Sequence, residues 1–482
     1  MAEQNLKEKT AKGILWGGIN NGGQQVLNLV FGIFLGRLLS PADYGMVGML
    51  TIFSLLAGAL QESGFISALN RKKDITQEDY NAVFWFNVLC GAVLYVILFF
   101  CAPLIADFFD QPKLVPLARL SFLNFVFASW GTTPRAVLFR NLRVKETAWM
   151  SLAALFTSGV TGVTLAWNGF AYWGIAIQNI VYCAMMTFFS WYFSGWRPSM
   201  HINLRPLRGM IGFSSKLLLT NLFTGINNNL FSVFFGRLYG ERMVGLYNQA
   251  NKWTGIGYTF LNGTLWGVTQ PVFARLENDR ERQLRAFRKM LRFTAFVSCP
   301  ALFGLALIAP EFITILITDK WIESARLMQI LCVGGAFVPI ASFYSNFLIS
   351  QGRSNVFLWN TIGLCLLQMA ALLLLYPYGV ETMVTVYVIL GFLWLPVWHF
   401  FVERLIGLRL WQAIFDIAPF VLCAALTMTV AYWVSTFFAS IYVAIIVKIT
   451  VALAVYVGMM LALRVVVFRE CIEFLLSRFK KK

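Results

Sequence analysis

Long apolar runs dominate this sequence, and they leave a lipid bilayer as the solvent in which the chain folds. A helix that crosses the hydrocarbon core needs about twenty predominantly apolar residues, and runs of this kind follow one another with few interruptions. Hydrophobic residues make up 59% of the 482 positions, and charged residues only 13%. The sequence therefore predicts an all-α polytopic membrane protein, with about 14 transmembrane helices of that length.

The predicted spans cover most of the chain. They lie near residues 14–38, 44–69, 80–108, 114–138, 147–167, 169–195, 210–238, 243–270, 290–318, 324–350, 355–376, 379–402, 411–437 and 440–467. The segment before the first span is polar, and the span leads straight into further apolar runs. We therefore expect the first helix to act as the insertion signal, not as a cleaved signal peptide.

Basic residues collect in every second connector between the predicted spans. Clusters follow the even-numbered spans, as in Arg71 to Lys73 and Arg275 to Arg292, whereas the alternate connectors hold few. Because Lys and Arg favour the cytoplasmic side, both termini are expected in the cytoplasm. The net charge of +17 thus indicates topology, not nucleic-acid binding. Two basic segments, around Pro271 to Lys289 and Arg469 to Lys482, are expected to form amphipathic helices on anionic headgroups.

The residues that build most enzyme sites are absent from the sequence. Eight cysteines are scattered, almost all within apolar runs, and neither His201 nor His399 has a second ligand at metal spacing. No Walker, HExxH or GxSxG motif is present. We expect no catalytic residue, metal or cofactor, and coupling of transport to a proton or sodium gradient stays open.

An internal repeat divides the chain. The sequence FLGRLLSPADYG at Phe34 to Gly45 recurs as FFGRLYGERMVG at Phe234 to Gly245, at an offset of 200 residues without a gap. Each copy opens a block of six predicted spans, so the copies should have the same orientation and be related by an axis along the membrane normal. We predict one lobe at residues 1–209, a second at 210–403, and two extra helices with a basic cytoplasmic tail at 404–482.

Polar residues form stripes at helical spacing within four of the spans, although polar groups are costly in a bilayer and normally face a cavity or the bundle interior. Lys216 and Lys252 lie within spans and outnumber Glu62, the one clear anion, so the lumen is expected to favour an anionic passenger. The substrate-cavity candidates are Asn21, Asn28, Glu62, Lys216, Asn221, Asn227, Asn228, Asn248, Asn251, Lys252 and Asn262.

Several segments resemble Wzx-type flippases of the multidrug, oligosaccharidyl-lipid and polysaccharide (MOP) exporter superfamily, and in particular the colanic-acid-exporter-like branch. The resemblance rests on segments such as GRLLSPADYG at Gly36 to Gly45, KKDITQEDYNAVFWFN at Lys72 to Asn87, GFSSKLLL at Gly212 to Leu219 and VGLYNQA at Val244 to Ala250. It is nearly continuous up to about residue 360 and diffuse afterwards. Some relatives carry an acidic residue where this chain has Asn20 and Asn21, so proton-coupling residues are not transferred there.

This resemblance implies two six-helix lobes around a central cavity and alternating access without ATP hydrolysis. It implies an undecaprenyl-diphosphate-linked oligosaccharide as substrate, an inner-membrane location, and a role in making lipopolysaccharide, capsule or exopolysaccharide. Polysaccharide polymerase machinery and anionic lipids are the expected partners, and nucleic acid is not. Two alternatives stay open: a drug or cation antiporter of the same superfamily, and a membrane polysaccharide polymerase or ligase.

Overall fold

The computed structural model describes residues 2–62, 69, 75–200, 203–207, 225–227, 229–276 and 279–479. Within these ranges the regular elements are helices, without a β-strand, which confirms the all-α class. The chain divides into two compact units, Met1–Gly245 and Leu246–Lys482. The predicted lobe boundaries at residues 209 and 403 stay a prediction.

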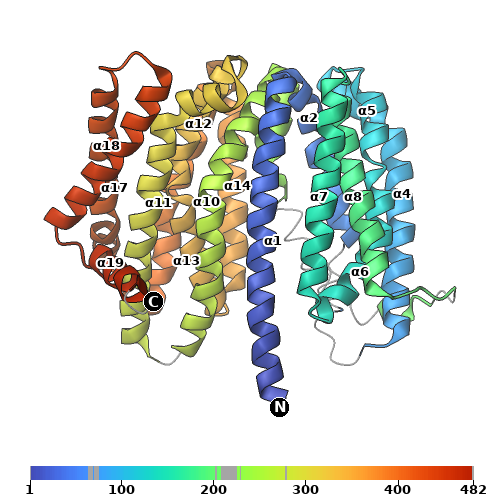
Figure 1. Cartoon of the computed structure of the whole chain (residues 1–482), viewed down its shortest axis with the longest axis horizontal. Helices are drawn as coiled ribbons and strands as arrows, with labels where there is room; N and C mark the ends of the chain where they lie inside the picture. The colour runs from blue at the N-terminus through green and yellow to red at the C-terminus, as the bar shows by residue number, and fades with distance from the viewer. Residues whose placement is uncertain are drawn as a thin grey trace. The chain divides into compact units, whose positions relative to one another are not determined.

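The first unit is a bundle of long helices (Figure 1). Its helices are α1 (Ala2–Leu38), α2 (Pro41–Glu62), α4 (Gln77–Phe109), α5 (Leu114–Ser121), α6 (Asn124–Arg140), α7 (Val144–Trp167) and α8 (Tyr172–Ser194), followed by a helical stretch at 229–239. Helix α7 packs against both α1 and α8, and α6 packs against α4 and α8. At the start of α4, Thr76 accepts a hydrogen bond from the Asp79 N–H while the Asp79 carboxylate accepts one from the Thr76 N–H, so a capping box fixes where the helix begins.

The second unit is also helical and is organised around one long helix. After α10 (Glu241–Arg275), which begins in the first unit, its helices are α11 (Arg280–Ile317), α12 (Ile322–Gly335), α13 (Val338–Ser350), α14 (Ser354–Leu375), α15 (Val380–Leu393), α16 (Leu395–Ile406), α17 (Leu410–Ser435), α18 (Ile441–Ala462) and α19 (Val466–Phe479). Helix α11 packs against α12, α17 and α18. The two helices that we predicted outside the repeat, α17 and α18, therefore attach to this unit through α11.

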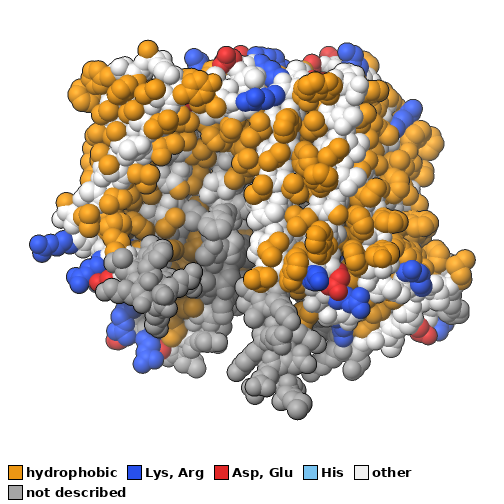
Figure 2. Space-filling view, viewed as in Figure 1, with side chains coloured by type: hydrophobic (Ala, Val, Ile, Leu, Met, Phe, Trp, Pro, Cys, Tyr) orange, Lys and Arg blue, Asp and Glu red, His pale blue; other side chains and the backbone are white. Residues whose placement is uncertain are grey.

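Eleven helical segments of the described residues are long and apolar enough to cross a membrane. Figure 2 shows hydrophobic side chains over the middle of the visible helices and most Lys, Arg, Asp and Glu side chains near their ends. The protein is thus a multi-pass membrane protein. Two further predicted spans fall on α1 and α10, which have 37 and 35 residues but carry polar stripes that lower their hydropathy. The remaining one, at 210–238, lies largely outside the described residues.

The prediction of an interfacial amphipathic helix around Pro271 to Lys289 was wrong. Residues from Arg280 onward are the first turns of α11, which continues without interruption to Ile317. Its side chains Phe287 and Leu291 are fully buried against Phe273 and Phe343. The prediction of an apolar face was correct, but protein covers this face and not lipid, because Phe273 of α10 and Phe343 of α13 pack against it.

Candidate functional site

The two copies of the repeat meet where α2 and α10 begin. At the 200-residue offset, Pro41 corresponds to Glu241 and Gly45 corresponds to Gly245. A Cβ atom on Gly45 would overlap the carbonyl oxygen of Glu241, and a Cβ atom on Gly245 would overlap the carbonyl oxygen of Pro41. Reciprocal contacts of this kind are what a two-fold axis produces. They support the predicted repeat and explain why both copies place glycine at this position.

The polar stripe predicted on α1 lies on an exposed part of that helix. Asn21 and Asn28 are both exposed, and they are seven residues apart, so they share one face. Gln24 donates to the Asn20 side chain at 2.8 Å. Exposed asparagines on a helix of spanning length need water or a polar ligand, because hydrocarbon offers them no hydrogen-bond partner.

Several of the predicted cavity residues fall where the structure gives no side-chain position. Lys216, Asn221 and Asn228 lie outside the described residues, and for Glu62 only the backbone, at the end of α2, is described. Asn227 is half-buried in the first unit, and its Oδ1 atom has no hydrogen-bond partner among the described residues.

Helix α10 brings four of the predicted residues together within the second unit. Lys252, Asn248 and Asn251 are half-buried neighbours, and Asn262 follows about three turns later. The Lys252 ammonium nitrogen lies 5.6 Å from the centroid of the Trp253 ring, a distance at which the ring quadrupole attracts a cation. No carboxylate of the described residues forms an ion pair with Lys252. The Asn262 Oδ1 atom is buried on the same helix and has no hydrogen-bond partner among the residues that the structure describes.

Trp253 packs this part of α10 against α11. Its side chain is buried and packs edge to face on Phe312 of α11, with the ring centroids 5.3 Å apart. At the next position, the Thr254 hydroxyl oxygen lies 3.4 Å from the Cys332 sulfur of α12. The polar stripe of α10 therefore lies beside the face of the same helix that packs into the core of the second unit.

Sequence reasoning missed two buried carboxylates in the second unit. Asp416 of α17 is almost completely buried and bonds to both Arg288 and Arg292 of α11. Glu311 of α11 bonds to Lys448 of α18 at 2.6 Å. The prediction that Glu62 is the one clear anion within the spans was therefore wrong. An acidic residue inside an apolar run was the signal available in the sequence.

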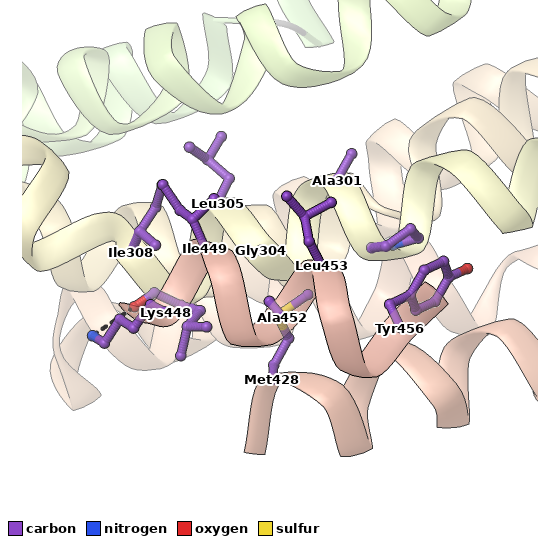
Figure 3. Close-up of a pocket in the computed structure, with 12 residues that line it drawn as sticks. Ala301, Gly304, Leu305, Ile308, Met428, Lys448, Ile449, Ala452, Leu453 and Tyr456 are labelled. Carbon is purple, nitrogen blue, oxygen red and sulfur yellow. Dashed lines mark hydrogen bonds between the residues drawn. The ribbon is translucent and has the colours of Figure 1, made fainter. Parts of the chain in front are cut away.

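Lys448 of α18 lies inside an apolar run, and its ammonium group contacts the neighbouring helix α11. Besides its bond to Glu311, its ammonium group donates to the Leu307 carbonyl oxygen at 3.1 Å and lies 5.7 Å from the centroid of the Tyr432 ring. Residues of α11, α17 and α18 line a cavity of about 260 Å³. Lys448 lies at one end of it (Figure 3). The other lining residues, among them Leu305, Ile449 and Leu453, are mostly apolar.

Comparison with known proteins shows that this chain is similar to proteins of polysaccharide biosynthesis. It is 27% identical over 358 residues to the lipopolysaccharide biosynthesis protein WzxC of Escherichia coli K12, covering 73% of this chain and 72% of that protein. It is 24% identical over 438 residues to the teichuronic acid biosynthesis protein TuaB of Bacillus subtilis, covering 89% and 90%.

Among solved structures, the lipid II flippase MurJ in an inward closed conformation shares the fold, with a TM-score of 0.76 and 15% identity over 95% of this chain and all of that chain. The family described as polysaccharide biosynthesis protein matches residues 34–326, which is more than half of the sequence. The protein is a member of this polysaccharide biosynthesis protein family.

Proposed function

We propose that this protein is a flippase that carries a lipid-diphosphate-linked oligosaccharide across the bacterial cytoplasmic membrane by alternating access, and that it is a transporter and not an enzyme. The family membership and the relatives named for polysaccharide biosynthesis support the substrate class. The fold shared with the lipid II flippase supports the architecture. An undecaprenyl-type carrier is the lipid that we assign to the substrate.

The polar face of α10 is the structural observation that carries this proposal. Lys252 has no carboxylate partner among the described residues, and a membrane-embedded ammonium needs a counter-charge or water. A diphosphate supplies that charge, whereas a cationic drug would be repelled. Asn248, Asn251 and Asn262 on the same helix offer hydrogen bonds suited to sugar hydroxyls. Lys216 and the asparagines of α1 are proposed as further substrate contacts.

The proposed orientation follows from the basic connectors. We place both termini on the cytoplasmic side, in line with the alternation of Lys and Arg along the sequence. Anionic lipids are proposed to contact the basic segments at that side. The polysaccharide polymerase, which would receive the substrate in the outer leaflet, is proposed as a functional partner.

A deletion of the gene in the bacterium that encodes it tests the proposal. We expect loss of surface polysaccharide and accumulation of lipid-linked oligosaccharide that an impermeant glycosidase cannot reach in spheroplasts. Accumulation of lipid-linked units that the glycosidase does reach would indicate a polymerase or ligase instead. Normal surface polysaccharide with raised sensitivity to cationic drugs would indicate the antiporter.

A further inference from the structure

Four cationic side chains from the first turns of α11 line a pocket against the start of α19. The pocket has a volume of about 240 Å³ and is lined by Arg285, Arg288, Lys289, Arg292, Val466 and Glu470, together with Val467. The four cations stand at positions i, i+3, i+4 and i+7, which is one face of a helix. No part of the proposed transport cycle uses this face.

Buried Asp416 holds two of these arginines in place. Its side chain is 2% exposed, and it accepts hydrogen bonds from Arg288 Nε at 2.7 Å, Arg288 Nη2 at 2.9 Å and Arg292 Nε at 2.6 Å. Each guanidinium has five N–H donors, so further donors remain on the partly exposed sides of both groups. The arrangement fixes the two guanidiniums before any ligand arrives, which reduces the entropy lost on binding.

The pocket keeps an excess of positive charge. Asp416 carries one negative charge for two arginines, and Lys289 pairs with Glu470 at 2.7 Å. Arg285 is 70% exposed, and Glu281, 3.8 Å away, is even more exposed to solvent. Because guanidinium groups match the geometry of phosphate oxygens, a phosphate group is the ligand that this pocket fits.

Apolar side chains beside the pocket indicate that the phosphate belongs to a lipid. Helix α18, one of the segments able to cross a membrane, ends at Ala462, and α19 begins at Val466. Leu463, just after α18, is 58% exposed, and Val466, the first residue of α19, is 64% exposed. The cationic pocket thus lies at the end of a membrane span, where lipid headgroups are found, next to surface that acyl chains can cover.

We propose that this pocket binds the headgroup phosphate of one anionic phospholipid. Arg285, Arg288, Lys289 and Arg292 of α11 hold the phosphate, and the acyl chains lie along the end of α18 beside Val466 of α19. Asp416 orients two of the four cationic side chains, Arg288 and Arg292, so this site is specific and differs from a diffuse attraction between basic residues and an anionic surface. The proposal does not depend on the identity of the transported substrate.

Lipid binding by the purified full-length protein tests this site. Native mass spectrometry in detergent, with added phosphatidylglycerol or phosphatidylcholine, should show one phosphatidylglycerol retained preferentially. Arg285→Gln combined with Lys289→Gln should weaken that binding by about tenfold or more, since each basic residue near a membrane surface contributes about 1 kcal/mol. Both side chains are largely exposed and do not contact Asp416, so the variant should unfold at the same temperature as the wild type in lipid-free detergent.

Arg469→Gln is the matched control, because Arg469 is on α19, is 82% exposed and does not line the pocket. It should leave phosphatidylglycerol binding unchanged. Equal weakening by the control and by the double variant would overturn the proposal in favour of a diffuse surface effect. Equal retention of phosphatidylcholine would overturn it as well. Displacement of the lipid by millimolar inorganic phosphate would show a site for free phosphate and would contradict the assignment to a phospholipid.

Discussion

Gly45 and Gly245, which are 200 residues apart in the sequence, face each other where α2 and α10 begin. A Cβ atom on Gly245 would lie 3.1 Å from the backbone nitrogen of Gly45, and it would overlap the Pro41 carbonyl. The repeated motif thus puts the same residue type on both sides of one close helix contact. The absence of a side chain is what lets the two backbones approach.

Gly45→Ala and Gly245→Ala should destabilise the protein to a similar extent. Each added methyl group overlaps a backbone carbonyl, so the helices must separate, at a cost of about 1–3 kcal/mol. Thermal unfolding of the purified protein measures the effect. Gly263→Ala is the control, because nothing lies within 4 Å of its Cβ position, and alanine is favoured over glycine in a helix. If Gly45→Ala unfolds no earlier than Gly263→Ala, the close contact is absent in the folded protein.

The Asp416 carboxylate should contribute more to stability than an exposed ion pair does. Asp416→Asn keeps the shape of the side chain but removes the charge that holds Arg288 and Arg292, and we expect a loss of about 1–3 kcal/mol. Glu381→Gln is the control, since the pair between Arg326 and Glu381 is exposed, with 3.9 Å between Nη1 and Oε1, and such pairs contribute less than about 1 kcal/mol. Similar effects of the two substitutions in denaturant unfolding would contradict this ranking.

Lys448 and Glu311 should be strongly coupled in a double-mutant cycle. Their pair is buried within the helices that line the cavity of Figure 3, so removing one partner leaves an uncompensated charge, at a cost of up to about 3–5 kcal/mol. Lys448→Met and Glu311→Gln should each lower the thermal stability of the protein in lipid nanodiscs. The double variant should be more stable than either single variant. Additive losses would mean that the two groups do not interact in the membrane.

Lys252 should be required for polysaccharide export but not for folding. Lys252→Ala should abolish surface polysaccharide at a normal protein level, because the anionic part of the substrate loses its counter-charge. Lys252→Arg should retain part of the activity. The exposed Lys113→Gln, at the N-terminal end of α5, serves as the control and should export normally. Full export by a variant that combines Lys216→Gln with Lys252→Gln would exclude both lysines as substrate contacts.

Cysteine labelling should place residue 73 and α19 on the cytoplasmic side. Lys73→Cys, in an otherwise cysteine-free protein, should react with an impermeant maleimide only after the cells are permeabilised. In a second variant that keeps Cys471 as its single cysteine, this thiol should also react only after permeabilisation. It should react slowly at pH 7, because burial and the neighbouring Glu470 raise its pKa and only the thiolate reacts. Its rate should therefore rise as the pH increases through and above the ordinary thiol range. Rapid labelling of Lys73→Cys in intact cells would reverse the orientation.

Helix formation in this protein could be read from the sequence because it depends on local properties. In a bilayer each backbone group must find its partner within the same helix, so the apolar runs predict helices such as α4 and α18 directly. The 200-residue repeat and the polar faces of α1 and α10 also needed only residue spacing. Residue spacing thus predicted α1, with its asparagines, and α10, with Lys252 and further asparagines, although the hydropathy of both helices is low.

Only the tertiary structure decided which faces of these helices meet. Asp416 bonds to an arginine 128 positions earlier in the chain, and Lys448 bonds to a carboxylate 137 positions away. Periodicity showed that Phe287 and Leu291 share an apolar face, but it could not show that protein, not lipid, covers that face. Protein and lipid both accept an apolar side chain, so the local sequence is the same in either case, and the choice depends on contacts between segments distant in the chain.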